Sequence, residues 1–196
     1  MIKTLIALNI AVFLGWYVLP AEFMFTNFLV SWNHLLYGKY WTLLTSVFSH
    51  NQAFHIFFNM MVLRSFGPIM IDLLGKRRFI TFYLIAGIVA SFSHAAVSAF
   101  YLHQPELPAL GASGSLAGII LLFSLLFPQE KLLLFGVIPI KAIWGALAFV
   151  GIDIWGLIAQ SHGGGFQIGH GAHLGGSFIG LCYFLILKRK FRKVSL

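Results

Sequence analysis

Six apolar segments, separated by short polar or glycine-rich stretches, divide the chain. They extend over residues 2–19, 54–74, 79–101, 113–127, 140–159 and 169–187. A helix needs on the order of 20 apolar residues to cross about 30 Å of hydrocarbon. The pattern therefore predicts six membrane-spanning helices with both chain ends on one side. Segment 113–127 is short for a span, and we expect its ends to extend into the flanking residues or to be buried in protein.

The amino-acid composition supports a membrane protein and excludes a soluble globular enzyme. Of the 196 residues, 59% are hydrophobic and 9% are charged, whereas a soluble domain has roughly 45–50% apolar and about 25% charged residues. So few polar side chains cannot cover a water-soluble fold. No internal repeat, low-complexity tract or flexible linker interrupts the chain, so we expect a single all-α domain over residues 1–196.

Basic residues lie mainly on one predicted side of the membrane. The formal net charge is +8, from 13 Lys and Arg against 5 Asp and Glu. Eleven of the basic residues fall on the side of the chain ends: Lys3, Lys76, Arg77, Arg78, Lys131, Lys141, Lys188, Arg189, Lys190, Arg192 and Lys193. Because short loops rich in Lys and Arg stay in the cytoplasm, we expect a multi-pass protein of the cell's inner (plasma) membrane with cytoplasmic termini. The basic tail, residues 188–196, is expected to lie on anionic lipid and not to bind nucleic acid.

The stretch between the first two segments, residues 20–53, is long, almost uncharged and rich in Phe, Trp and Tyr. Aromatic side chains suit the boundary between lipid headgroups and water, where an apolar ring and a polar tip are both satisfied. We therefore expect a membrane-associated loop between the first and second helices.

Polar side chains inside apolar segments are the first candidates for function, because every polar group buried in lipid needs a partner. Four of them fall near the external ends of the second, fourth and sixth segments: His55, Asn59, Ser113 and His173. His55 and Asn59 are four residues apart and share one helix face. Ser113 opens its segment between Gly111 and Gly114, where free backbone amides and a close approach of another chain are available. A serine and a histidine brought together in this way could form a hydrogen bond.

The motifs together resemble the rhomboid intramembrane serine proteases and stand in that family's order. The resemblance rests on the run from Gly38 to His50, on His55 and Asn59, on the run from Gly111 to Gly114, and on the run from Ala172 to Gly176. It covers nearly the whole chain. It implies a bundle of six transmembrane helices of the compact bacterial type, with the active site towards the extracytoplasmic face.

The resemblance also implies roles for individual residues. Ser113 would be the nucleophile and His173 the general base, as a dyad without a carboxylate third member. The oxyanion hole would consist of His55, Asn59 and the Ser113 backbone amide. Gly111, Gly114 and Gly176 would shape the site and pack the helices, and Trp41 and His50 would support the loop. No metal or other cofactor is expected, and the partners would be transmembrane protein substrates and the lipid bilayer.

Two departures from the family's pattern concern residues around this site. The loop's usual Trp-Arg pair is Trp41-Thr42, which removes an arginine that anchors the loop. The aromatic residue commonly found four after the serine, where it stacks on the catalytic histidine, is Ala117. We therefore expect His173 to be less firmly oriented and the activity to be lower than is typical of the family.

Asp153 has no counterpart in the resemblance. We expect it either to pair with His94 or to be neutral, with a proton path as the functional alternative to a simple hydrogen bond between helices. His162 and His170, around the glycine-rich stretch before Ala172, are candidates for substrate contact or are merely hydrated.

Two other functions remain open at the level of the sequence. One is a catalytically weak or inactive protein of the same fold that binds membrane-protein clients. The other is a small transporter or proton channel built on Asp153, His94 and His170, although neither paired broken helices nor an inverted repeat is visible.

Overall fold

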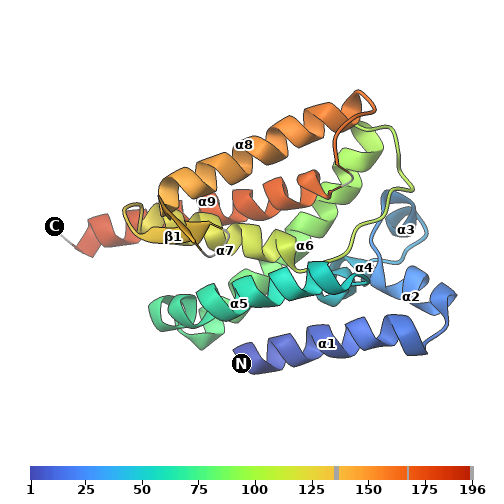
Figure 1. Ribbon diagram of the computed structural model, residues 1–196, viewed down its shortest axis with the longest axis horizontal. Coiled ribbons are helices and arrows are strands. Elements are labelled where there is room, and N and C mark those ends of the chain that lie inside the picture. Colours follow the sequence, from blue (N-terminus) through green and yellow to red (C-terminus); the bar gives the residue numbers. More distant parts are fainter. Residues whose placement is uncertain (135–136, 167, 195–196) are drawn as a thin grey trace.

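The computed structural model describes residues 1–134, 137–166 and 168–194 and is mostly helical (Figure 1). Its elements in chain order are α1 (Ile2–Val18), α2 (Ala21–Phe28), α3 (Trp32–Leu36), α4 (Thr42–Thr45), the 3₁₀-helix η1 (Ser46–Phe48), α5 (Ala53–Leu74), α6 (Lys76–Phe100), α7 (Ser113–Leu126), β1 (Lys131–Leu134), β2 (Ile138–Lys141), α8 (Ala142–Ser161) and α9 (His170–Val194). Each of the six predicted segments corresponds to one helix, and the bounds differ by up to three residues except at the end of α9, which extends to Val194 instead of residue 187.

Four helices of the described part are long and apolar enough to cross a membrane. They are α5, α6, α8 and the His170–Arg189 part of α9. The helices α1 and α7 are shorter, with 17 and 14 residues. At 1.5 Å per residue, α7 rises only about 21 Å, less than the thickness of the hydrocarbon. The predicted membrane-embedded helical bundle is therefore confirmed, whereas six crossings remain a prediction for α1 and α7.

The short helix α7 lies inside the bundle, between α6 and α9. Nine of its residues are buried, and α8 and α1 lie on opposite outer sides of the bundle (Figure 1). A Cβ atom on Gly176 of α9 would overlap the Gly114 carbonyl oxygen, and one on Gly118 would lie 2.7 Å from the Gly176 carbonyl oxygen. Glycines at these positions let the backbones of α7 and α9 touch directly.

Tight connections hold the ends of the spanning helices. Gly75, with φ 82°, joins α5 directly to α6 in a conformation that disfavours other residues. An antiparallel hairpin of β1 and β2 joins α7 to α8, with Lys131 paired to Lys141. The sequence pattern did not predict this hairpin, and it assigned Ile140, which lies in β2, to the fifth helical segment.

The stretch from α2 to η1 forms a packed cap of short helices beside α1 and α6 (Figure 1). Val30, between α2 and α3, forms an antiparallel β-bridge with Ala109 in the loop that precedes α7. Thr42 is fully buried, and its hydroxyl donates to the Lys39 carbonyl at 2.6 Å. Trp41 is half exposed and donates from its indole N–H to the Asn27 side-chain oxygen at 3.1 Å. The cap is thus anchored by backbone pairing and hydroxyl contacts in place of the arginine that the family pattern suggested.

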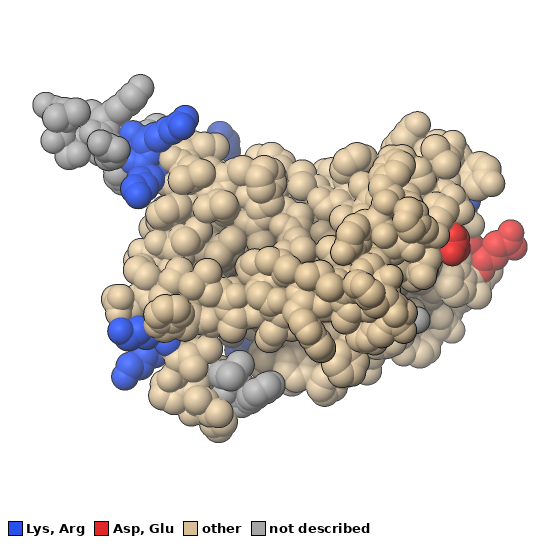
Figure 2. Space-filling model, turned by 90° about the horizontal axis from the view of Figure 1, so that it is seen from above, with Lys and Arg blue, Asp and Glu red and all other residues tan. Residues whose placement is uncertain are grey.

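Basic residues gather at one end of the long axis of the molecule. In the space-filling view, most of the visible Lys and Arg side chains lie at this end, and the visible Asp and Glu side chains lie at the other (Figure 2). We call the first end the basic face and define it by these described residues: Lys3, Lys76, Arg77, Arg78, Lys131, Lys141, Lys188 and Arg189. The starts of α5, α7 and α9 point away from the basic face, so the predicted site residues lie towards the other end of the bundle (Figure 1).

Candidate active site

Ser113 and His173 meet at the starts of two adjacent helices. Ser113 is the first residue of α7, and His173 lies in the first turn of α9. The Ser113 Oγ atom is 2.9 Å from the His173 Nε2 atom, although the two residues are 60 positions apart in the chain. The glycine contacts between α7 and α9 allow this approach. The side chain of His173 is 11% exposed, so the pair lies mostly in protein with limited access from outside.

Asp153 of α8 lies directly behind the imidazole. Its Oδ1 atom is 3.0 Å from His173 Nδ1 and 2.7 Å from His170 Nδ1. A carboxylate oxygen accepts, so His173 donates from Nδ1 and keeps Nε2 free to accept the serine proton. The resemblance implied a dyad without a carboxylate, and the structure instead gives the geometry of a Ser-His-Asp triad.

The predicted pairing of Asp153 with His94 is wrong. His94 Nε2 lies 3.2 Å from the Leu107 carbonyl oxygen and 3.3 Å from the Ser98 hydroxyl. It is held by α6 and the following loop, whereas Asp153 faces α9. His170, which we considered as a loop residue in contact with substrate, is buried as the second donor to Asp153.

The aromatic ring beside His173 comes from an unexpected helix. Ala117 is buried and offers no ring, but the Phe149 ring of α8 lies 5.3 Å from the His173 ring at an interplanar angle of 32°. Phe149 and Asp153 are four residues apart, so one face of α8 supplies both contacts. The expectation of a poorly oriented His173 is therefore not supported by this geometry.

The predicted oxyanion donors lie around the loop before Ser113. Gly111 has φ 122°, and a Cβ atom there would lie 2.6 Å from His55 Cε1, so glycine makes room for the His55 ring. The backbone N–H groups of Gly111 and Ala112 bond to the Ser46 carbonyl oxygen and to His50. Among the described residues, the next amide, that of Ser113, has no backbone acceptor. It is available to a ligand at the start of α7.

Asn59 is engaged differently from the prediction. Its Nδ2 atom is 3.0 Å from the His55 carbonyl oxygen and 3.0 Å from His50 Nε2. Both amide protons are therefore used in this arrangement. Asn59 holds the loop and α5 in place, and it can donate to an oxyanion only after it releases one of these partners.

His50 connects the cap to the serine loop. It is fully buried, and its Nε2 atom accepts from Asn59 and, at 3.4 Å, from the Ala112 backbone N–H. Burial, reinforced by the neighbouring His55 imidazole, lowers the pKa of His50 to about 3. His50 is therefore neutral at physiological pH, which suits an imidazole that accepts two hydrogen bonds.

One other predicted candidate lies outside this cluster. His162, at the end of α8, is exposed and bonds to the Ile158 carbonyl oxygen at 2.8 Å. The residues that sequence analysis missed are Asp153 and Phe149 as partners of His173. The available signal was their spacing on one predicted helix, together with the i, i+3 spacing of His170 and His173.

Comparison with known proteins agrees with the motifs. The family profile described as the Rhomboid domain matches residues 37–190. RHOMBOID-like protein 12, mitochondrial, of Arabidopsis thaliana is 33% identical, with 96% of this chain and 59% of that protein aligned. Rhomboid protein 1, mitochondrial, of Saccharomyces cerevisiae is 34% identical, with 93% of this chain and 52% of that protein aligned. Presenilin-associated rhomboid-like protein A, mitochondrial, of Danio rerio is 32% identical, with 91% of this chain and 45% of that protein aligned.

These relatives bear on location and on family. The chain spans about half their length. All three are mitochondrial proteins by name, which contradicts the predicted location in a plasma membrane. The positive-inside pattern assigns one face of a bilayer but does not distinguish between membranes, and that is why the prediction failed. The profile and the relatives together cover most of the chain, and the protein belongs to the rhomboid family.

Proposed function

We propose that this chain is an intramembrane serine endopeptidase that hydrolyses peptide bonds in or near transmembrane segments of other membrane proteins. The observation that carries the proposal is the 2.9 Å contact between Ser113 Oγ and His173 Nε2, with the Asp153 carboxylate on the far side of the imidazole. The family supports the reaction class. The names of the relatives support a mitochondrial membrane as the location.

Acylation begins with attack of Ser113 Oγ on the carbonyl carbon of the scissile peptide bond. His173 Nε2 takes the hydroxyl proton during the attack, and the resulting imidazolium is stabilised by Asp153. The oxyanion of the tetrahedral intermediate accepts hydrogen bonds from the Ser113 backbone amide and from His55. Asn59 supports these donors by holding His50 and the His55 carbonyl oxygen. When the intermediate collapses, the C–N bond breaks and His173 returns the proton to the leaving amine.

Deacylation repeats the same steps with water. His173 removes a proton from the attacking water molecule, the second tetrahedral intermediate collapses, and the Ser113 hydroxyl is regenerated with release of the carboxylic acid product. Phe149 and Asp153 hold the imidazole plane in both half-reactions. No step requires a metal ion or an organic cofactor.

The test is cleavage of a single-span substrate protein in liposomes by the wild type, Ser113→Ala and His173→Ala. Ser115→Ala is a matched control, because Ser115 is buried two residues further along α7 and donates to the Tyr83 carbonyl oxygen. We expect cleavage by the wild type and by Ser115→Ala, and none by the other two variants. A folded wild type that cuts none of several substrates but binds them would favour the inactive, client-binding alternative.

A further inference from the structure

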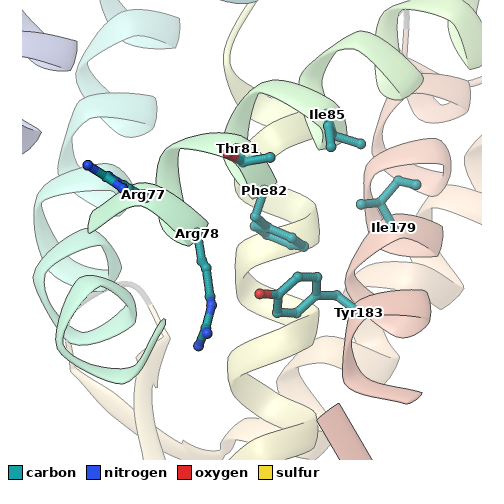
Figure 3. A pocket seen from close by; sticks show the side chains of 7 residues that line it. All are labelled: Arg77, Arg78, Thr81, Phe82, Ile85, Ile179 and Tyr183. Atoms are coloured by element: carbon teal, nitrogen blue, oxygen red, sulfur yellow. The ribbon is translucent and has the colours of Figure 1, made fainter. Parts of the chain in front are cut away.

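A cavity lies away from Ser113, between α6 and α9. Its volume is about 360 Å³, and the residues that line it include Arg77, Arg78, Phe82 and Ile85 of α6 and Ile179 and Tyr183 of α9 (Figure 3). We call it the α6–α9 groove. It is open to the outside of the bundle and reaches the basic face at the start of α6.

The groove is polar at one end and apolar at the other. Arg78 and the Tyr183 hydroxyl lie at the same end, and Ile85 and Ile179 lie beyond the Phe82 ring (Figure 3). From Arg78 to Ile85, α6 rises about 10 Å at 1.5 Å per residue. The groove therefore extends from the headgroup region of the bilayer into the hydrocarbon, as an amphiphilic ligand requires.

The charge at the polar end is not neutralised within the protein. Arg77 and Arg78 are exposed, and among the residues that the structure describes neither is within ion-pair distance of a carboxylate. A guanidinium group presents parallel N–H donors that match phosphate oxygens. Figure 3 shows that the Arg78 side chain and the Tyr183 hydroxyl share the polar end, whereas the Arg77 side chain points away from them. These two positive charges at headgroup depth favour an anionic headgroup over a zwitterionic one, whose own ammonium group they repel.

The apolar end offers surface for a hydrocarbon chain. Phe82 is 2% exposed and closes the inner wall, whereas Ile85 is 47% exposed and faces outward. A volume of about 360 Å³ lies within the range of pockets that hold small organic ligands. Inorganic phosphate alone would leave this apolar part of the groove unused.

We propose that the α6–α9 groove binds one anionic phospholipid, with its phosphate on Arg78 near the exposed charge of Arg77, and with an acyl chain along Phe82, Ile85 and Ile179. Tyr183 donates its hydroxyl proton to the headgroup. The bound lipid bridges α6 to α9, the helix that carries His173. This proposal does not depend on the proposed protease activity, because it concerns a separate cavity.

The test is native mass spectrometry of the delipidated full-length protein with equal amounts of dioleoyl phosphatidylglycerol and dioleoyl phosphatidylcholine. We expect one retained phosphatidylglycerol per protein, preferred over phosphatidylcholine by about tenfold or more. Both headgroups carry a phosphate, but only phosphatidylcholine carries a cation, which the charges of Arg77 and Arg78 repel. The double variant Arg77→Gln/Arg78→Gln should lose this preference. The matched control Lys131→Gln/Lys141→Gln removes two charges from the basic face outside the groove and should keep it.

Two further measurements distinguish lipid binding in the groove from general charge attraction and from binding of a phosphate group alone. Ile179→Trp fills the apolar part without removing a charge and should reduce retention of phosphatidylglycerol. This variant tests binding in the groove even if the arginine variant does not fold. Glycerol phosphate at millimolar concentration, which carries no acyl chain, should not displace the lipid. The proposal is overturned if the arginine variant retains the lipid, if both charge variants lose it equally, if Ile179→Trp has no effect, or if glycerol phosphate displaces it.

Discussion

Replacement of Asp153 by asparagine tests how His173, the proposed general base, is held. Asparagine has the same shape but no charge, and either end of its amide group can face His173. With the oxygen towards the ring, the Nδ1 bond survives as a neutral contact. With the NH₂ group towards the ring, His173 must carry its proton on Nε2 and cannot accept the Ser113 proton. Both arrangements reduce the stabilisation of the transition state, in which the imidazole is charged.

The size of the effect follows from the single contact that is lost. His173 makes one 3.0 Å bond to Asp153 Oδ1, an oxygen that also accepts from His170 at 2.7 Å. A hydrogen bond to a charged group contributes about 1.5–3 kcal/mol. At about 1.4 kcal/mol per tenfold change in rate, Asp153→Asn should lower kcat by about ten- to a hundredfold. KM should change little, because the charge acts on the imidazolium and not on bound substrate.

The assay is a kcat and KM measurement on a single-span substrate in liposomes, with thermal unfolding as the test of folding. Asn9→Ala is the control, because Asn9 is a buried polar residue of α1 whose amide donates to the Leu5 carbonyl oxygen of its own helix. A folded Asp153→Asn protein with kcat within twofold of the wild type would refute the triad. A change confined to KM would refute the assigned role equally.

Three more predictions concern the surroundings of the site. Phe149→Leu should lower kcat about two- to tenfold, since an aromatic pair contributes about 0.5–1.5 kcal/mol; an unchanged kcat would show that the ring does not position the imidazole. Gly176→Ala should strongly lower the thermal unfolding temperature, because a Cβ there overlaps a backbone carbonyl of α7. Gly151→Ala is the control and should leave the temperature unchanged, because the space around Gly151 is open. Equal unfolding temperatures for the two variants would contradict the packing account. Because the pKa of His50 falls to about 3 from an ordinary 6.5, the unfolded chain binds a proton that the folded chain does not, and stability should decrease as the pH falls below about 6.5, by about 2 kcal/mol at pH 5. Unfolding curves at pH 7 and pH 5 should show at least this loss, and His50→Gln should make the loss smaller by about 2 kcal/mol. A loss of unchanged size in the variant would assign the effect to another group.

Sequence reasoning predicted that Ser113 and His173 lie together because helix ends carry the necessary information. An even number of apolar segments and the basic residues at their ends place the starts of α5, α7 and α9 on one side. Ser113 and His173 then have to lie near one another. The contact at 2.9 Å needed in addition the glycines of α7 and α9, which the motifs also contained.

The same reasoning did not find the contacts of α8 with His173, because those contacts depend on how α8 is rotated about its own axis. Asp153 and Phe149 point to His173 only if one particular face of α8 turns towards α9. The apolar pattern of α8 does not specify that face, since the helix is hydrophobic nearly all round and lipid accepts any apolar side. Family analogy pointed to position 117 for the stacking ring, and the ring comes from a different helix. The β1–β2 hairpin was missed for a related reason, because its apolar residues resemble a continuation of the neighbouring helical segments.

The most direct measurement of the central claim is covalent labelling of the purified protein with a fluorophosphonate probe, followed by peptide mass spectrometry to locate the modified residue. The account predicts modification at Ser113 alone, no modification at the neighbouring Ser115, loss of labelling in His173→Ala and slower labelling in Asp153→Asn. A folded wild type that does not react, or a His173→Ala variant that reacts at the wild-type rate, would contradict the activation of Ser113 by His173.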